Sequence, residues 1–176
     1  RRVGIMGLGV LGQAAARAVA GFGFPVRGWS ATLKDLAGIE TFAGDAALGD
    51  FLAGTDILVC LLPLTSATRG LLDHRLFDRL PDGASLVNAG RGGHVVEADL
   101  LAALDGGRLG GAILDVLAAE PAPADHPLLS HPRVMVTPHV ASATQPAGAA
   151  RQVIQGARAH LRGEPIPHAI DRGQGY

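Results

Sequence analysis

The stretch VGIMGLGVLG at residues 3–12 decides the fold of this 176-residue chain. It begins with a short apolar run typical of a buried strand and ends in the first turn of an amphipathic helix. Three glycines between them match G-x-G-x-x-G: the first permits a tight turn, the second lets the backbone approach a pyrophosphate, and the third lets helix and strand pack closely. A bound anion then lies at the positive end of the helix dipole. The predicted dinucleotide-binding turn comprises Gly7, Leu8, Gly9, Val10, Leu11 and Gly12.

The remaining sequence alternates between strand and helix patterns. This alternation predicts an α/β fold, a Rossmann-type doubly wound parallel sheet with helices on both faces. Asp45 is expected to cap the second helix, and the Ala/Pro-rich segment 118–127 is expected to be an extended loop. The predicted strands are 3–7, 25–30, 40–43, 56–63, 84–90, 111–116 and 133–137, and the predicted helices are 10–22, 45–52, 97–107 and 144–161.

Composition excludes several classes of protein. With 48% hydrophobic and 18% charged residues, the chain is not intrinsically disordered, and its length suits one domain. A net charge of -1 argues against binding of nucleic acid or of an anionic membrane surface. No apolar run approaches the roughly 20 residues of a membrane-spanning helix, and the Arg1-Arg2 start does not lead into an export signal. The single cysteine, Cys60, fits a reducing, cytoplasmic compartment and is expected to be a buried packing residue.

The loop after the second predicted strand bears on the choice between NAD and NADP. An NAD site usually places an Asp or Glu there, about 20 residues after the glycine turn, to bind the ribose hydroxyls. In this chain the first acid is Asp35. Without an acid a 2′-phosphate meets no repulsion, which favours NADP slightly over NAD, although these positions also suit ordinary surface residues. The predicted cofactor residues of this loop are Trp29, Ser30, Thr32 and Lys34.

Polar residues follow the later strands at the positions where each strand ends. In an open parallel sheet ligands bind outside the carboxyl ends of the strands, so these residues share one edge with the glycine turn. No spacing of cysteines and histidines suggests a metal site, and the chain contains neither a G-x-S-x-G elbow nor a P-loop. The residues predicted at this edge are Pro63, Thr65, Arg91, Asp115, Glu120 and His139.

Three of these residues suit the reduction of a 2-keto acid beside a nicotinamide. Arg91 offers a permanently charged fork for a carboxylate, His139 a proton for the carbonyl oxygen, and Glu120 a carboxylate that orients the histidine ring. Each also has a structural alternative: Arg91 could cap a helix, His139 could be a capping or loop residue, and Glu120 could be a solvated loop residue. The other histidines are expected to be structural: His74, His94, His126, His131, His160 and His168.

Taken together, these motifs resemble those of a known family, the D-isomer-specific 2-hydroxyacid dehydrogenases. The resemblance rests on the glycine turn together with CLLPLT at 60–65, LPDGASLVNAGRGGHVVEADLLAAL at 80–104, GAILDVLAAEP at 111–121 and HPRVMVTPHVASAT at 131–144. Within the family, GFGFPVRGWS at 21–30, the segment that begins DVLAAEPAPADHP and the closing DRGQGY look most like bacterial glyoxylate/hydroxypyruvate reductases of the A type.

The resemblance implies a role for each matched residue. It makes Arg91, Glu120 and His139 the catalytic residues and implies a homodimer. The related formate dehydrogenases have Gln where Glu120 stands, which counts against that reaction. Relatives that prefer NADPH carry arginines where this chain has Ala31 and Leu33. The resemblance places Asp115 near the nicotinamide carboxamide and, in the cofactor cleft, Leu62, Pro63, Thr65, Ala89 and Gly90.

The resemblance also implies a division of the chain. Residues 1–163 are expected to form the NAD(P)-binding domain, and residues 164–176 a tail that packs on a substrate domain in family members. The family's N-terminal segment, which builds that substrate domain, has no counterpart here. We therefore expect the chain by itself to have little or no activity, because closure of the two domains normally expels water from the reaction.

Two alternative functions stay open. One is a non-catalytic NAD(P)-binding or dimerisation module. The other is a β-hydroxyacid dehydrogenase of the 6-phosphogluconate type, which opens with a similar glycine turn but relies on a lysine in a later helical domain. This chain has a single lysine, Lys34, which argues against that family.

Overall fold

The computed structural model describes residues 1–142, 144–167 and 169. The chain separates into two compact units, 1–139 and 140–176, and each is described here by itself. The expected boundary between residues 163 and 164 stays a prediction.

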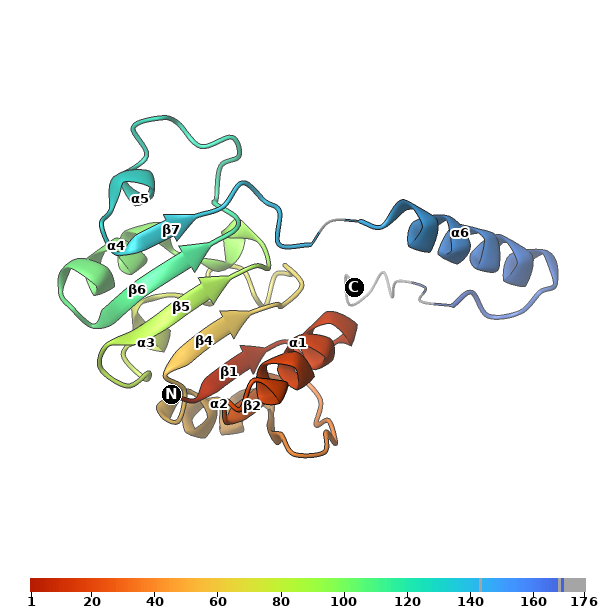
Figure 1. Cartoon of the computed structure of the whole chain (residues 1–176), viewed down its shortest axis with the longest axis horizontal. Coiled ribbons are helices and arrows are strands. Elements are labelled where there is room, and N and C mark those ends of the chain that lie inside the picture. The colour runs from red at the N-terminus through yellow and green to blue at the C-terminus, as the bar shows by residue number, and fades with distance from the viewer. Residues whose placement is uncertain (143, 168, 170–176) are drawn as a thin grey trace. The chain divides into compact units, whose positions relative to one another are not determined.

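The first unit contains a sheet of seven parallel strands in the order β3-β2-β1-β4-β5-β6-β7 (Figure 1). The strand order runs outward in both directions from β1, as in a doubly wound sheet. This confirms the predicted fold class, including the short third strand. The strands are β1 (Val3–Met6), β2 (Val26–Ser30), β3 (Glu40–Ala43), β4 (Ile57–Cys60), β5 (Ala84–Asn88), β6 (Leu109–Leu114) and β7 (Val134–Val136).

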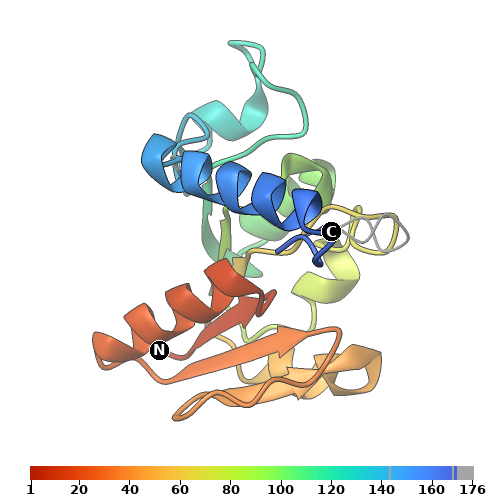
Figure 2. The same ribbon diagram turned by 90° about the vertical axis from the view of Figure 1, so that its right-hand side faces the viewer.

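Helices cover both faces of the sheet, and the side chains of neighbouring strand residues point to opposite faces. On β1, Ile5 packs with Ala16 of α1, whereas Met6 packs with Phe51 of α2 on the other face. Figure 2 shows this layering from the side. The helices of this unit are α1 (Val10–Gly21), α2 (Gly44–Ala53), α3 (His74–Phe77), η1, a 3₁₀ turn (Gly92–His94), α4 (Glu97–Asp105) and α5 (Pro127–Ser130).

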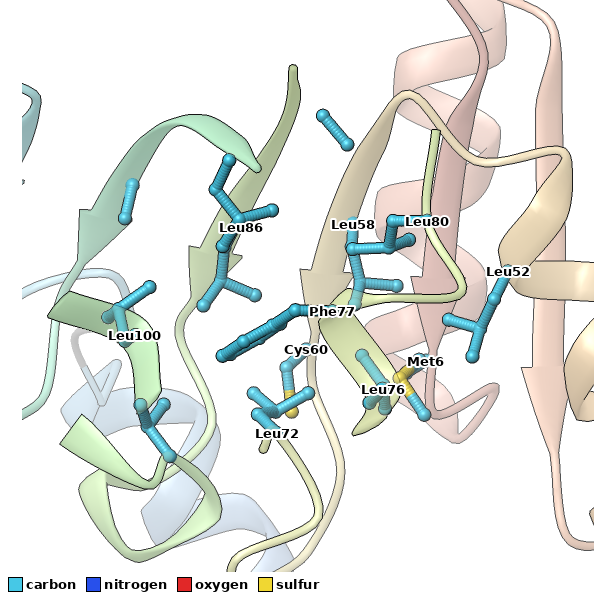
Figure 3. Close-up of a cluster of buried hydrophobic side chains, with 14 of the residues drawn as sticks. Met6, Leu52, Leu58, Cys60, Leu72, Leu76, Phe77, Leu80, Leu86 and Leu100 are labelled. Carbon is cyan, nitrogen blue, oxygen red and sulfur yellow. The ribbon is translucent and has the colours of Figure 1, made fainter. Parts of the chain in front are cut away.

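The larger core lies between the sheet and helices α2, α3 and α4 (Figure 3). Phe77 of α3 is fully buried among apolar residues from β4, β5 and α4. Burial of each such leucine or phenylalanine stabilises the fold by about 1.5–3 kcal/mol. Cys60 lies in this core with no exposed surface, which confirms that it is a packing residue. The labelled members in Figure 3 are Met6, Leu52, Leu58, Cys60, Leu72, Leu76, Phe77, Leu80, Leu86 and Leu100.

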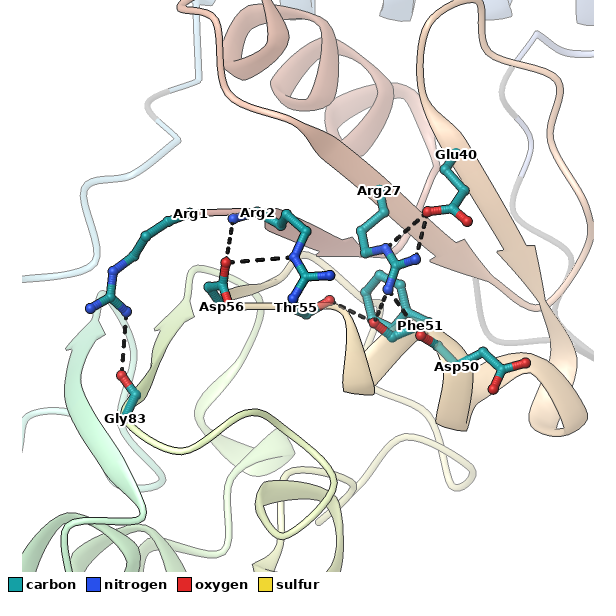
Figure 4. Close-up of polar contacts among 9 residues, drawn as sticks. All are labelled: Arg1, Arg2, Arg27, Glu40, Asp50, Phe51, Thr55, Asp56 and Gly83. Carbon is teal, nitrogen blue, oxygen red and sulfur yellow. Dashed lines mark hydrogen bonds and ion pairs between the residues drawn. The ribbon is translucent and has the colours of Figure 1, made fainter.

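Charged side chains fasten the amino end of the sheet, opposite the glycine turn (Figure 4). Arg27 of β2 pairs with Glu40 of β3, with Nη2 2.5 Å from Oε2. Its Nη1 donates to the carbonyls of Asp50 and Phe51 at 2.9 and 3.1 Å. These carbonyls lie at the C-terminal end of α2, where the negative end of the helix dipole stabilises a positive charge. The Asp56 carboxylate accepts from the Arg2 amide at 2.6 Å, and this bond lowers the pKa of Asp56.

The structure corrects some details of the sequence prediction. Asp45 does not cap α2: the helix begins at Gly44, its N-cap is Ala43, and no side chain bonds the cap. The short helices α3 and α5 and the turn η1 were not predicted, because three or four residues show no periodicity. The strand predicted at 56–63 ends at Cys60, since the chain leaves the sheet there to form a loop. The extended loop at 118–127 is confirmed, with α5 beginning at Pro127.

The second unit consists of helix α6 (Pro146–Leu161) and the segment after it. Pro146 is its first residue, a position where the missing amide hydrogen is tolerated, so the helix starts two residues later than predicted. The chain turns back after Gly163, which has a φ of 68°, and Ile166 lies against Gly156. His168 and residues 170–176, which include the closing DRGQGY, lie outside the described residues. Among the described residues, no helix has both the length and the hydropathy needed to cross a membrane.

Two glycines of α1 give a matched test of the glycine turn. A Cβ on Gly12 would lie 1.7 Å from the Gly7 carbonyl oxygen, whereas a Cβ on Gly21 meets nothing within 4 Å. We expect Gly12→Ala to lower the free energy of unfolding by about 3 kcal/mol through overpacking, and Gly21→Ala to raise it by up to about 1 kcal/mol. Urea unfolding of both variants measures the difference. Equal stabilities would contradict the close approach.

Candidate functional site

The strands are all parallel, so their carboxyl ends form one edge, towards which the arrowheads of β1, β4, β5, β6 and β7 point in Figure 1. The residue that follows a strand donates its amide to a carbonyl at, or one residue before, the end of the neighbouring strand, so the hydrogen-bonded ladder continues beyond the strands. Three of the predicted site residues, Gly7, Ala89 and Asp115, are donors in these last bonds of the ladder. These bonds are Gly7 to Trp29 (2.8 Å), Leu61 to Met6 (2.8 Å), Ala89 to Cys60 (3.2 Å), Asp115 to Asn88 (2.9 Å) and Thr137 to Leu114 (2.9 Å).

The glycine turn has the shape that a pyrophosphate requires. Gly7 has a φ of 103°, which side-chain-bearing residues rarely adopt, and a Cβ there would lie 2.8 Å from the Leu61 oxygen. Gly9 is exposed and a Cβ on it would meet no atom within 4 Å, so space for a ligand lies in front of it. Because α1 begins at Val10, the amides of its first turn have no acceptor within the helix. The turn therefore fits a dinucleotide.

The side chains between these glycines differ in position. Leu8 is buried in the smaller core with α1, so it faces a ligand only through its backbone. Val10 and Leu11 are 83% and 53% exposed, an unusual position for two aliphatic side chains on a helix that is otherwise packed on the sheet. Their exposure leaves an apolar surface beside the predicted anion site.

The loop after β2 presents fewer donors than its sequence indicates. The Trp29 indole is buried, and its Nε1 donates to the Gly44 carbonyl at 2.9 Å, so Trp29 reaches this edge through its backbone alone. The Ser30 hydroxyl donates to the Thr32 carbonyl at 2.8 Å and so shapes the loop. Thr32 is exposed and Lys34 is half-buried. The Asp35 side chain is also exposed.

Two further loops complete the predicted cofactor edge. After β4, Leu62 is buried while Pro63 and Thr65 are partly exposed. Thr68 closes this loop: its hydroxyl donates to the Pro63 carbonyl at 2.7 Å and accepts from the Thr65 amide at 2.8 Å. After β5, Ala89 is half-buried and Gly90 is buried.

Glu120 and His139 form the hydrogen-bonded pair that the sequence predicts. His139 Nδ1 lies 2.8 Å from Glu120 Oε2, and the other carboxylate oxygen accepts from the Leu117 amide at 3.0 Å. An ionised carboxylate only accepts, so Nδ1 carries the hydrogen and donates it. The other ring nitrogen, Nε2, has no partner among the residues that the structure describes. Glu120 therefore fixes the tautomer and leaves Nε2 open.

The backbone of His139 is held in a left-handed conformation. Its φ is 54°, and no other non-glycine residue among those described has a positive φ. Such a conformation costs of the order of 1–3 kcal/mol and is found mainly at functional sites. The His139 amide is shared by the carbonyls of Asp115 and Thr137, at 3.0 and 2.9 Å. The Thr137 hydroxyl also donates to the Asp115 carboxylate at 2.5 Å, so β6 and β7 hold the histidine together.

Electrostatics keeps Glu120 ionised. The hydrogen bond from His139 is the main cause that lowers the pKa of Glu120 below its ordinary value of 4.5, and the Leu117 amide adds to it. Partial burial and the nearby Asp115 oppose this effect. Because the folded pKa is depressed, the pair contributes stability above pH 4.5 and loses that contribution as the pH falls through the folded pKa.

Arg91 lies in a turn that contacts the segment leading to Glu120. Its side chain is exposed, and Nη1 donates to the Gly90 carbonyl at 2.7 Å. The next residue, Gly92, is buried, and a Cβ there would lie 1.9 Å from the Leu117 oxygen. The turn that carries Arg91 therefore packs directly on the backbone whose amide bonds Glu120.

A cavity of about 360 Å³ is lined in part by the Glu120–His139 pair. This volume is at the lower end of the range for small-molecule sites. Its polar lining comes from the pair itself and from the Asp115–Thr137 contact, and its apolar lining includes Leu117 and Leu129.

Asn88 also belongs to this site, although it was not singled out from the sequence. The Asn88 side chain spans the Arg91 turn: Nδ2 donates to the Arg91 carbonyl at 3.0 Å, and Oδ1 accepts from the Gly90 amide at 3.1 Å. The available signal was a polar residue at the last position of a mostly apolar strand. His94, expected to be structural, contacts the same turn and is fully buried.

The structure also describes four other histidines, His74, His126, His131 and His160. Three of them contact carboxylates: His74 with Asp99 at 3.0 Å, His126 with Glu97 at 3.3 Å and His131 with Asp105 at 3.3 Å. The bonds from His74 lower the pKa of Asp99. Within the described part of the chain, no cluster of acids, histidines and cysteine has the arrangement of a metal site.

Comparison with known proteins relates this edge to one family. The model for the NAD-binding domain of D-isomer specific 2-hydroxyacid dehydrogenases matches residues 1–141. A glyoxylate/hydroxypyruvate reductase A from Klebsiella pneumoniae strain 342 is 48% identical over 174 residues, which cover 99% of this chain and 56% of the relative. The chain therefore spans about half the length of the curated relatives it matches.

Two solved structures are similar throughout. A D-isomer specific 2-hydroxyacid dehydrogenase from Xanthobacter autotrophicus Py2, in complex with NADPH and MES, is 47% identical with a TM-score of 0.97, covering 99% of this chain and 72% of that one. An NADPH-dependent glyoxylate/hydroxypyruvate reductase from Sinorhizobium meliloti, in complex with NADP and sulfate, is 44% identical with a TM-score of 0.96, covering 99% and 57%.

The coupling between Glu120 and His139 predicts a titration shift. In a pH series followed by carboxyl ¹³C NMR, we expect Glu120 to titrate below 4.5 and to move towards 4.5 in His139→Gln, which removes the main hydrogen bond. Asp99, whose pKa is lowered by His74, is the internal control and should not move. A Glu120 titration that is the same in both proteins would contradict the assigned pair.

Proposed function

Because this chain belongs to the D-isomer specific 2-hydroxyacid dehydrogenases, whose NAD-binding domain it contains, we propose that it serves the NAD(P)-dependent reduction of a small 2-keto acid. The substrate we propose is glyoxylate or hydroxypyruvate, and the product is the 2-hydroxy acid. The observation that carries the proposal is the 2.8 Å contact between His139 Nδ1 and Glu120 Oε2, which leaves Nε2 free to exchange a proton. An imidazole oriented in this way is suited to general acid–base catalysis.

His139 supplies the proton of the reaction. In reduction, the carbonyl carbon accepts a hydride while the carbonyl oxygen accepts the proton that Nε2 carries in the doubly protonated His139 ring, and the ring is left neutral with its hydrogen on Nδ1. The Glu120 carboxylate holds the ring through Nδ1 and stabilises its protonated form, a role that the lowered pKa of Glu120 supports. A positioned acid of this kind typically contributes about 10²- to 10⁴-fold to the rate.

Arg91 binds the carboxylate of the keto acid. Its guanidinium is exposed and makes one hydrogen bond among the described residues, to the Gly90 carbonyl, so donors remain for a substrate. A guanidinium pairs with a carboxylate through two parallel hydrogen bonds, which fixes the orientation of the acid as well as its position. The contact between Gly92 and Leu117 supports the placement of Arg91 near the histidine pair.

The glycine turn and the loops after β2, β4 and β5 hold the dinucleotide. When bound, the reduced nicotinamide supplies the hydride. The amides at the start of α1 bind the pyrophosphate, and Asp115 lies at the strand end where we place the carboxamide. Val10 and Leu11 offer an apolar surface along this edge.

We propose a modest preference for NADP over NAD. The relatives from Xanthobacter autotrophicus and Sinorhizobium meliloti were solved with NADPH and NADP. In this chain Thr32 and Lys34 are the donors available to a 2′-phosphate, while the Ser30 hydroxyl is used within the loop. The nearest acid, Asp35, lies five residues beyond Ser30, the end of β2.

Membership of this family also supports proposals about the domain division, the oligomeric state and the location of the protein. We propose that residues 164–176 belong with a substrate domain rather than with the cofactor domain, that the protein is a homodimer, and that it works in the cytoplasm. The buried Cys60 thiol, whose pKa burial raises to about 11, supports a protein that makes no use of thiol chemistry.

Cofactor binding tests the glycine turn and the β2 loop together. In calorimetric titrations, we expect NADPH to bind about fivefold more tightly than NADH, the factor that one net hydrogen bond of roughly 1 kcal/mol provides. Lys34→Gln should remove this difference by weakening NADPH alone. If neither dinucleotide binds, the proposed cofactor site is wrong.

Turnover tests the catalytic assignment. In the protein that carries this sequence, we expect His139→Gln to lower the rate of glyoxylate-dependent NADPH oxidation by about 10²-fold or more, because the proton donor is lost. NADPH affinity should be unchanged, since Glu120 and His139 do not contact the glycine turn. His74→Gln, a surface histidine with its own carboxylate partner, is the matched control and should keep full activity.

The outcomes separate the two candidate functions. NADPH binding without turnover in the parent protein would favour the non-catalytic module. Turnover that survives His139→Gln would remove His139 from the mechanism.

A further inference from the structure

His94 lies at the end of η1, between the two loops that flank the predicted site. Its side chain has no exposed surface. Nε2 is 3.2 Å from the carbonyl oxygen of Pro63 in the loop after β4, and Nδ1 is 3.1 Å from the amide nitrogen of Arg91 in the loop after β5. One imidazole therefore joins the predicted cofactor cleft to the backbone of the residue that we propose binds the substrate.

The two partners assign the tautomer of His94. A carbonyl oxygen only accepts, so Nε2 carries the hydrogen and donates it to Pro63. The Arg91 amide only donates, so Nδ1 is unprotonated and accepts. The Arg91 carbonyl is also 3.0 Å from Nδ1, but both lone pairs of that carbonyl already accept, from the Asn88 amide group at 3.0 Å and from the His94 backbone amide at 3.2 Å. Both ring nitrogens of His94 are thus paired in the Nε2–H form.

The neighbouring residues are shaped around this ring. A Cβ on Gly90 would lie 3.0 Å from both Cε1 and Nδ1 of His94, so a larger residue there would push the ring away. Asn88 fixes the Gly90 amide and the Arg91 carbonyl, and His94 fixes the Arg91 amide. The main chain of Arg91 is therefore held on both sides, while its guanidinium stays exposed.

We propose that His94 is a positioning residue: through Nδ1 it fixes the backbone of Arg91 and so aims the guanidinium at the carboxylate of the substrate. The role in substrate binding rests on the proposed function, whereas the positioning of the Arg91 backbone does not. His94 acts through Arg91 and touches neither substrate nor cofactor. A side chain with the same volume but no acceptor at Nδ1 would fill the space and leave the Arg91 amide unpaired.

Two conservative variants separate the two bonds of His94. In His94→Asn, the amide oxygen lies close to the position of Nδ1 and can accept from the Arg91 amide, but the side chain is too short to reach Pro63. In His94→Gln, the amide nitrogen lies close to the position of Nε2 and can donate to Pro63, but no acceptor faces the Arg91 amide. Each variant keeps one bond and loses the other.

We expect the two variants to differ in substrate binding. The KM for glyoxylate should rise about tenfold in His94→Gln, which corresponds to about 1.4 kcal/mol, and change less than about twofold in His94→Asn. The value of kcat and the dissociation constant for NADPH should stay close to those of the parent protein in both. A residue that only supports the fold would instead change both variants together, along with NADPH binding.

Two measurements without substrate test the positioning itself. The imidazole ¹⁵N spectrum of the parent protein should show His94 with its hydrogen on Nε2. The hydrogen-exchange rate of the Arg91 amide should rise at least about tenfold in His94→Gln relative to His94→Asn, because one amide has lost its acceptor and the other has not.

The results distinguish failure of this inference from failure of the proposed function. A parent protein without turnover, but with the expected tautomer and exchange rates, would reject the function and keep the positioning of Arg91. A hydrogen on Nδ1 in the parent protein would overturn the inference even if His94→Gln does not fold. The inference would also be overturned if the Arg91 amide exchanged at the same rate in His94→Gln and His94→Asn. In an active protein, equal KM values for glyoxylate in the two variants would overturn it as well.

Discussion

The parallel register of the strands is the constraint on which every other feature of the site depends. All seven strands end at the same edge, so Gly7, Arg91 and His139 follow strand ends although they are far apart in the sequence. The amide that follows β5 or β6 donates to the last residue of the strand beside it. These bonds carry the order of the sheet into the loops. A slip of one residue would turn each side chain to the opposite face and remove the site.

Close contacts between backbone segments complete the site, and they are possible because particular residues lack a Cβ. Gly12 brings α1 against the turn at Gly7, which aims the first amides of the helix at one point. Gly92 brings the turn that carries Arg91 against the backbone of Leu117, whose amide bonds Glu120. The same absence of a side chain thus shapes the predicted anion site and joins the two loops of the proposed catalytic site.

Two histidines of the chain show how partners determine the role of an imidazole. In His94 both nitrogens are paired and the ring is fully buried, so it orients its neighbours and has no nitrogen left for a ligand. In His139 the carboxylate of Glu120 engages Nδ1, and 51% of the side chain remains exposed. The free Nε2 of His139 is what makes it suitable for proton exchange. The strained backbone of His139 is consistent with a position selected for function.

The fold class and the cofactor type could be predicted from the amino-acid sequence, because glycine spacing and apolar periodicity are local and depend on backbone geometry alone. The sequence also located the edge residues, since parallel strands bring their ends together. Only the tertiary structure decided what the side chains contact. It turned the Trp29 indole into the core, set the geometry of the Glu120–His139 pair that the sequence predicts, and gave His94 partners in the loops after β4 and β5. The Trp29–Gly44 and His94–Pro63 contacts join residues that are 15 and 31 positions apart in the sequence, and no local pattern encodes a contact over such a separation.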